Sequence, residues 1–197
     1  MNSEKNHTQI EMRLETEHLS IRPIKEEDAP TMRDLLENHG FVDLDSPSFT
    51  DFPSPGYLPE EEALSFIKEA IDDGSTLLAL FQRDNEEKLL GFIEICPERL
   101  GRKSNKIHKI KHVVDDALRC SELLAEAYAS ITKVLFEKHD VGMLLFWACT
   151  DLPEEACEAE ICGFVRDESL DYVATVEYMG KVLYEGYTMT SSPAVEI

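Results

Sequence analysis

The sequence has few basic residues and no long apolar run. Lys and Arg number 19 against 40 Asp and Glu, which gives a formal net charge of −21. A surface of that charge repels nucleic acid and anionic membranes, so neither is expected as a partner, whereas an amine is a compatible substrate. No stretch approaches the roughly 18 apolar residues of a membrane-spanning helix, and residues 1–12 are polar and lack a signal-peptide core. These features predict a cytoplasmic protein.

Cysteine is scarce and odd in number. The five cysteines lie mostly within apolar runs, which is typical of buried free thiols in a reducing compartment rather than of disulfides. Two of them are five residues apart in an expected helix, and no second Cys/His pair completes a zinc site, so no metal is predicted. The five are Cys96, Cys120, Cys149, Cys157 and Cys162.

The common nucleotide and hydrolase motifs are also absent. The chain contains no G-x-x-x-x-G-K-[ST] phosphate loop, no G-x-G-x-x-G dinucleotide fingerprint and no G-x-S-x-G nucleophile turn. No cysteine has the exposed, activated context that a Cys/His hydrolase needs. These function classes are therefore excluded by inspection.

The apolar periodicity predicts one α/β domain. A mobile tail is expected over 1–12, the domain over 13–190 and a C-terminal tail over 191–197. Alternating or continuous apolar segments predict seven strands, and segments with a 3.6-residue period and acidic starts predict four helices. The strands are expected at 18–24, 76–82, 88–96, 107–115, 143–150, 171–178 and 181–190, and the helices at 25–40, 59–74, 121–139 and 152–164.

One consecutive group of elements sets the expected topology. The strand 107–115, the helix 121–139 and the buried apolar strand 143–150 form a βαβ crossover, so the two strands should be parallel neighbours. The other connections favour antiparallel pairing, which gives one mixed, mostly antiparallel sheet with helices on both faces. Strand 18–24 ends near Pro23 and is expected at or near a sheet edge.

Three segments of the chain resemble the GNAT acyltransferases. "RLETEHLSIRPIKEEDAPTMRDLL" (13–36) is similar to the opening of the branch that acetylates the N-terminal amines of ribosomal proteins. "LLGFIEI" (89–95) resembles its third strand, and "EAEICGFVRD" (158–167) resembles its last helix. The resemblance extends over about 13–190. It implies an acetyl-CoA-dependent N-acetyltransferase whose fourth and fifth strands splay apart around the cofactor.

The resemblance also implies where acetyl-CoA would bind. The pantetheine arm would pair with the strand 107–115, whose Val113 and Val114 N–H groups could hold the thioester carbonyl. The pyrophosphate would lie on the turn that opens the next helix, where the family usually has an Arg or Gln followed by two glycines. This chain has the cofactor-binding candidates Arg119, Cys120, Ser121, Glu122, Leu123 and Leu124 in that turn.

The turn departs from the family pattern at both glycine positions. Cys120 and Glu122 stand there, although glycine suits a backbone that approaches phosphate closely or needs a positive φ. Glu122 adds a negative charge near the expected pyrophosphate, so weak binding of acetyl-CoA is predicted. Arg119 is retained, and either phosphate or the neighbouring Asp115 and Asp116 could pair with it.

The catalytic candidates are residues that could move a proton. Transfer to an amine needs a base for the ammonium proton and an acid for the departing thiolate. Glu94 and His112 are the candidate bases, although an exposed strand position for Glu94 and a structural or surface role for His112 are the alternatives. Tyr187 is the candidate acid, and Tyr128 and Tyr184 were alternatives to it or core residues.

Two function classes remain open at this stage. The first is the N-acetylation of an amine, with a protein or peptide N-terminus as one acceptor class. The second is a catalytically silent GNAT-fold protein that serves as a binding module. The sequence does not decide between a monomer and a homodimer.

Overall fold

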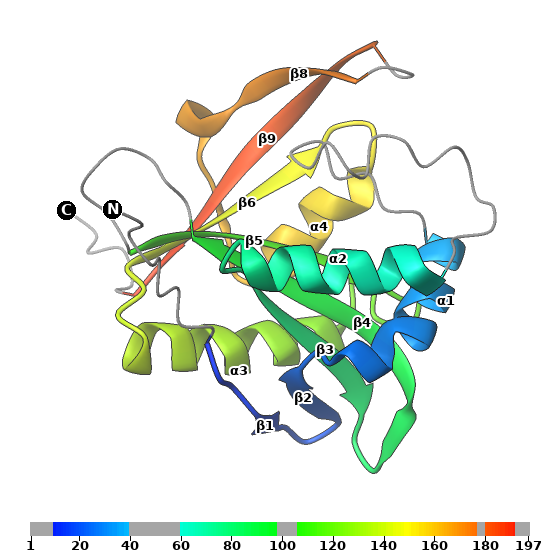
Figure 1. The fold of residues 1–197 in the computed structure, drawn as a ribbon. Coiled ribbons are helices and arrows are strands. Elements are labelled where there is room, and N and C mark those ends of the chain that lie inside the picture. The colour runs from blue at the N-terminus through cyan, green and yellow to red at the C-terminus, as the bar shows by residue number, and fades with distance from the viewer. Residues whose placement is uncertain (1–9, 40–59, 98–105, 177–179, 192–197) are drawn as a thin grey trace, which may run out of the picture.

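The computed structural model describes residues 10–39, 60–97, 106–176 and 180–191 of the 197-residue chain (Figure 1). The described residues form one mixed sheet of nine strands, in the order β1-β2-β3-β4-β5-β6-β9-β7, with β8 also paired to β9. The strands are β1 (Leu14–Glu15), β2 (Leu19–Pro23), β3 (Thr76–Gln82), β4 (Asn85–Pro97), β5 (Ile107–Val114), β6 (Met143–Cys149), β7 (Val165–Arg166), β8 (Tyr172–Val176) and β9 (Gly180–Thr190). All pairings are antiparallel except that of β5 with β6.

Helices cover both faces of this sheet, as predicted. The helices are α1 (Ala29–His39), α2 (Glu60–Asp72), α3 (Glu122–Lys138) and α4 (Pro153–Ile161), and short 3₁₀ turns occupy Glu26–Asp28 and Glu168–Leu170. One apolar core joins α1 and α2 to the sheet and contains Phe66, Phe92 and Val113. A second core lies on the opposite face under α3 and α4 and contains Ile93, Tyr128 and Phe164. Residues that alternate along β4 and β5 therefore point into different cores.

The parallel pair β5 and β6 separates along its length. The two strands are paired at Ile107–Met143, His108–Leu144 and Lys109–Leu145 and at no later register position, although β5 continues to Val114 and β6 to Cys149. The expected parallel neighbours that diverge at their C-terminal ends are thus confirmed. Figure 1 shows the two strands leaving a common origin, with α4 packed beside β6.

The start of the domain differs from the prediction. Met12 was placed in the mobile tail, but its side chain is buried in the α3–α4 core and the Ile10 N–H donates to Thr76 Oγ1 at 3.0 Å. Ile10, Met12 and Leu14 alternate with charged residues, so the sequence does contain a short period-2 signal here, and the expectation of a tail overlooked it. The rest of the tail, the C-terminal tail from 192, and the segments 40–59, 98–105 and 177–179 lie outside the described residues.

Smaller differences occur in the sheet. The two-residue strands β1 and β7 were not predicted, because two residues are too few to establish alternation. Because β1 pairs with β2, the latter is second from the edge, which agrees with its expected place near one. Of the helices in the described ranges, none is long and apolar enough to cross a membrane.

Candidate active site

The backbone of β5 is exposed to the gap between β5 and β6. The Asp115 N–H donates to the Leu90 carbonyl at 2.8 Å, and β4 and β5 stay in register from there to Pro97. Antiparallel pairing alternates, so the Val113 N–H points to β4 whereas the N–H groups of His112 and Val114 point to the side of β6. Pairing with β6 has already ended there. Of the two predicted carbonyl-binding amides, Val114 therefore faces the gap and Val113 belongs to the β4 ladder.

The turn after β5 is held by its own polar groups. The Asp115 carboxylate accepts from the Ala117 N–H at 2.9 Å, and the Ser121 hydroxyl donates to the Leu118 carbonyl at 2.7 Å. Ser121 is also the N-cap of α3, because its Oγ accepts from the Leu124 N–H at 3.2 Å. That contact occupies the Leu124 amide.

Two predicted donors remain at the start of α3. The N–H groups of Glu122 and Leu123 donate no recorded hydrogen bond within the described part of the chain. Unpaired amides at a helix start attract anions. The exposed Glu122 carboxylate lies in the first turn of α3, near the positive end of the helix dipole. Its negative charge therefore partly neutralises that end of the dipole.

Cys120 has the backbone conformation that favours glycine. Its φ is +46°, within the left-handed region. Cys120 thus adopts a conformation that glycine would accommodate without the strain of a Cβ. Burial, the adjacent Cys157 thiol and the Glu158 and Glu154 carboxylates raise the pKa of Cys120 to about 11, so the thiol stays protonated at neutral pH.

Replacing Cys120 with glycine is expected to stabilise the protein. An L-residue in the left-handed region costs about 1–2 kcal/mol, and glycine removes this cost but gains about 0.4–1 kcal/mol of unfolded-state freedom. Cys120→Gly should therefore be more stable than Cys120→Ala, which keeps the strain and removes the thiol, by about 1 kcal/mol in urea unfolding. Equal stability of the two variants would mean that the turn has relaxed away from the positive φ.

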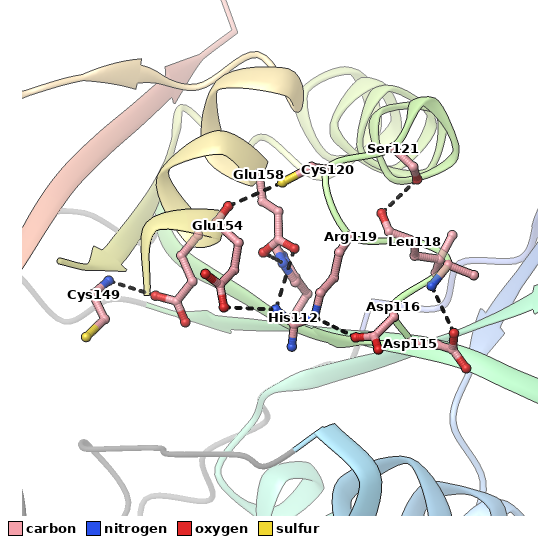
Figure 2. A network of polar contacts seen from close by, with 12 residues as sticks. His112, Asp115, Asp116, Leu118, Arg119, Cys120, Ser121, Cys149, Glu154 and Glu158 are labelled. Carbon is pink, nitrogen blue, oxygen red and sulfur yellow. Dashed lines mark hydrogen bonds and ion pairs between the residues drawn. The ribbon is translucent and has the colours of Figure 1, made fainter. Parts of the chain in front are cut away.

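The Arg119 guanidinium is surrounded by carboxylates (Figure 2). Its Nε lies 3.3 Å from Asp116 Oδ1, and its Nη1 lies 3.8 Å from both Glu154 Oε1 and Glu158 Oε1. The Cys120 thiol donates to the Glu154 carbonyl at 3.6 Å. Helix α4 is therefore attached to the turn by the residues that were expected to meet the pyrophosphate.

His112 is the centre of a buried polar cluster on the α3–α4 face. Its Nε2 lies 2.9 Å from Glu158 Oε2, and its Nδ1 lies 2.7 Å from the Tyr128 hydroxyl. Each ring nitrogen of His112 therefore has an oxygen partner, one a carboxylate and the other a hydroxyl. The ring also stacks on Phe146, with 5.5 Å between centroids. His112 is thus neither a surface histidine nor an isolated one.

Burial in this cluster changes the acidity of neighbouring groups. Burial raises the pKa of Tyr128 well above its usual value, so its hydroxyl is a donor at neutral pH. Glu155 accepts from the Cys149 N–H at 2.7 Å, at the open end of β6, and burial outweighs that bond and raises the Glu155 pKa. Carboxylates of α4 therefore lie at both margins of the gap.

Glu94 lies on the other face of the sheet. It is only 6% exposed, so it does not face solvent. Its register partner is Lys111, two residues beyond the last β5–β6 pair, and Lys111 Nζ lies 3.2 Å from Glu94 Oε2 as an ion pair that is not aligned for a hydrogen bond. The Cys96 thiol donates to Glu94 Oε1 at 3.1 Å. Glu94, on the neighbouring strand β4, and His112, on β5, thus lie on opposite faces of the sheet.

Tyr187 lies on a different strand from the other two catalytic candidates. It is on β9, which pairs with the side of β6 opposite the gap. Its hydroxyl is 3.5 Å from Glu185 Oε2, and the Arg166 guanidinium lies over its ring. Glu94, on β4, and Tyr187, on β9, are therefore each one strand away from the β5–β6 gap, whereas His112 lies on β5 itself.

The fold of the described residues is similar to that of solved acetyltransferases. The S5-alanine ribosomal-protein acetyltransferase from Vibrio fischeri matches with a TM-score of 0.70 at 12% identity, over 92% of this chain and 98% of that protein. A GNAT-family acetyltransferase from Bacillus anthracis matches at 0.67 and 13%, over 91% and 99%. The Salmonella typhimurium enzyme that modifies the N-terminal serine of ribosomal protein L7/L12 matches at 0.67 and 14%, over 89% and 96%.

The chain has the GNAT fold. The likeness covers about nine tenths of the chain, and at these identities it establishes the architecture. A scan of protein-family models and a search of curated proteins found no match.

The GNAT frame permits a test of whether acetyl-CoA fits these residues. The backbone fits, because the β5–β6 gap, the outward amides of His112 and Val114 and the left-handed Cys120 are all present. The side chains add a condition, because α4 carboxylates lie against Arg119. Arg119 could pair with a pyrophosphate here only after those carboxylates release its guanidinium.

Sequence reasoning missed the side chains that pair with His112 and Glu94. Glu158 was quoted only as part of a helix motif, and Lys111 and Cys96 were not considered as partners of Glu94. A faint signal for Glu158 exists, since it lies on the same helical face as Glu155 and Cys162. An acidic residue on that face could not be distinguished from a solvated one.

Proposed function

We propose that the protein is an acetyl-CoA-dependent N-acetyltransferase that acts on an amine, with a protein or peptide N-terminus as the acceptor class. The observation that carries this proposal is the separation of β5 and β6 beside a helix start, with the amides of His112 and Val114 directed into the gap. An extended ligand can pair with such a strand edge as an additional strand. The acceptor class is supported by the N-terminal serine named for one structural neighbour, by the ribosomal-protein alanine named for another, and by the similar opening segment 13–36.

The donor and the acceptor would use opposite faces of the sheet. The outward amides of β5 and the N–H groups of Glu122 and Leu123 would hold acetyl-CoA, with Arg119 as the positive charge near its pyrophosphate. The bound cofactor would supply an acetyl thioester. The Val114 N–H is placed to polarise a carbonyl in the gap.

Glu94 would prepare the amine on the α1–α2 face. An amine is protonated at neutral pH and must lose a proton before it attacks. Glu94 is a buried carboxylate on β4, the strand next to β5, and its Oε2 accepts no hydrogen bond from the described residues but lies 3.2 Å from Lys111 Nζ. Once an amine takes the place of the Lys111 ammonium beside it, that oxygen would receive the ammonium proton directly or through a water molecule.

Acetyl-CoA is expected to stabilise the folded protein. A ligand present at one hundred times its dissociation constant raises the free energy of unfolding by about 2.7 kcal/mol. Millimolar acetyl-CoA should therefore raise the melting temperature, and peptides with a free N-terminus should gain one acetyl group in mass spectrometry. Peptides with a blocked N-terminus are the control.

The two readouts separate the parts of the proposal. A melting temperature that acetyl-CoA leaves unchanged at millimolar concentration would contradict donor binding. Stabilisation without acetylation of a broad set of amines would contradict the transferase activity and favour a binding module that has kept the fold.

A further inference from the structure

Glu158 is the most enclosed charged residue of the candidate site. Its side chain is 1% exposed, although it belongs to the helix after β6 and carries a carboxylate. Only Oε2 is satisfied, by His112, while Oε1 accepts no hydrogen bond from the described residues and lies 3.8 Å from Arg119 Nη1 (Figure 2). A buried carboxylate with one oxygen unpaired is costly unless a nearby positive charge compensates it. Arg119 is that charge.

Titratable groups from every packed element face this carboxylate. His112 approaches from β5, Arg119 and Cys120 from the turn, and Tyr128 from α3. On α4 itself the neighbours are Glu154, Glu155 and Cys162. Arg119 and, when charged, His112 supply the positive charge in this described group, so removing Arg119 from Glu158 leaves an excess of carboxylates.

We infer that Glu158 is the residue that sets the affinity for the donor. Its carboxylate is paired with the Arg119 guanidinium, and the donor's pyrophosphate must replace that carboxylate as the partner of Arg119. The inference rests on the proposed function and names the group that a donor must displace. Arg119 cannot pair fully with the diphosphate and with the glutamates at the same time. A diphosphate beside Arg119 would also lie beside Glu158 and Glu154, and the negative charges would repel one another.

Displacement should be accompanied by the uptake of a proton. When the donor's negative charge replaces the attraction of Arg119, the carboxylates of this cluster face more negative charge, which favours the uptake of a proton by the cluster. The proton comes from solvent and remains in the cluster while the donor is bound. Binding coupled to uptake of one proton strengthens as the pH falls, by at most about tenfold per pH unit.

Calorimetric titration of the unmodified protein tests this coupling. Dephospho-CoA is the probe, because it keeps the pyrophosphate diester and lacks the 3′-phosphate, which itself titrates at a pKa of about 6. Titrations at pH 7.5 in buffers of different ionisation enthalpy give the number of protons taken up. We expect a clear fraction of a proton, up to about one, per molecule bound. Binding with an enthalpy independent of the buffer would overturn the inference.

A matched pair of variants identifies the responsible carboxylate. Glu158→Gln keeps the acceptor oxygen for His112 and removes the charge, so dephospho-CoA should bind about tenfold or more tightly, equivalent to 1.4 kcal/mol, with little proton uptake. Glu160→Gln changes the net charge equally on an exposed position of the same helix and should stay within about twofold of the unmodified protein.

The outcomes distinguish this inference from the proposed function. Tighter binding in Glu158→Gln alone supports both. Equal binding by all three proteins, or weaker binding in Glu158→Gln, overturns the inference and leaves the donor site intact. Absence of binding by every protein contradicts the proposed function itself. Because the buffer series uses the unmodified protein, the test holds even if Glu158→Gln does not fold.

Discussion

Glu94→Gln is expected to lower acetyl transfer to an amine by about 10²–10⁴-fold, the usual contribution of a general base. The amide has nearly the shape of the carboxylate but cannot accept the ammonium proton. Glu94 lies on the α1–α2 face, whereas the backbone amides of β5 that are proposed to hold acetyl-CoA point into the β5–β6 gap. Acetyl-CoA should therefore stabilise the variant as much as it stabilises the unmodified protein. The measurement is steady-state acetylation of a reactive peptide together with the melting temperature with and without acetyl-CoA.

A matched substitution controls for loss of charge on that face. Glu61 is exposed on α2, which packs on the same side of the sheet, so Glu61→Gln should keep turnover within about threefold. If Glu94→Gln turned over as fast as the unmodified protein, Glu94 would be a buried structural partner of Lys111 and Cys96, and the base would have to be sought elsewhere.

The second large effect concerns stability. Arg22 and Asp28 form a buried, two-bonded ion pair in which Arg22 Nη1 and Nη2 donate to the carboxylate at 2.8 and 2.9 Å. Asp28 also accepts from the Lys25 N–H at 2.8 Å, and the Arg22 guanidinium lies 4.5 Å from the Phe81 ring centroid. Arg22→Ala leaves the Asp28 charge buried and unpaired, so the free energy of unfolding should fall by about 3–5 kcal/mol.

The exposed pair beside it provides the comparison. Lys25 Nζ and Glu27 Oε1 are 2.8 Å apart on the surface, and Lys25→Ala should cost at most about 1 kcal/mol. Urea unfolding of both variants gives the two values. A loss below about 1 kcal/mol in Arg22→Ala would show that the buried pair is not what fastens β2 to the turn before α1.

The same pair predicts a pH dependence. Burial alone would raise the pKa of Asp28, but hydrogen bonds from Arg22 and the Lys25 N–H, with the attraction of Arg22, outweigh it and lower the pKa. A lowered pKa contributes stability above the unfolded value of about 3.9, and this contribution is lost as the pH falls through the lower folded value. In Asp28→Asn, that part of the acid-induced loss of stability should be absent.

The sequence predicted the architecture because periodicity, crossover topology and chain order agree. The crossover 107–150 required parallel strands, and the resemblance supplied their separation. The opening segment 13–36 carried the resemblance, and the structure gives a physical role to two of its residues. Arg22, in the arginine–proline pair, and Asp28, in the acidic helix start, form the buried ion pair. A pair six residues apart connects a strand to a turn, so its spacing matches neither the helix nor the strand period.

The details of the site were less accessible from the sequence. Which of Val113 and Val114 faces the gap depends on the hydrogen-bond register of β5, and one residue of slip would exchange them. The positive φ of Cys120 contradicts its residue preference and follows from the surrounding turn. Glu158 is buried only because His112 and Arg119 converge on it from other elements, which no local pattern encodes.

Hydrogen exchange with and without acetyl-CoA tests the central claim that the gap beside β5 holds the donor. The account predicts slower exchange of the amides of His112 and Val114 on β5 and of Glu122 and Leu123 at the start of α3. The amides of the hairpin β8–β9 should exchange at the same rate in both samples. Unchanged exchange at those four amides in saturating acetyl-CoA, or protection confined to other parts of the chain, would contradict it.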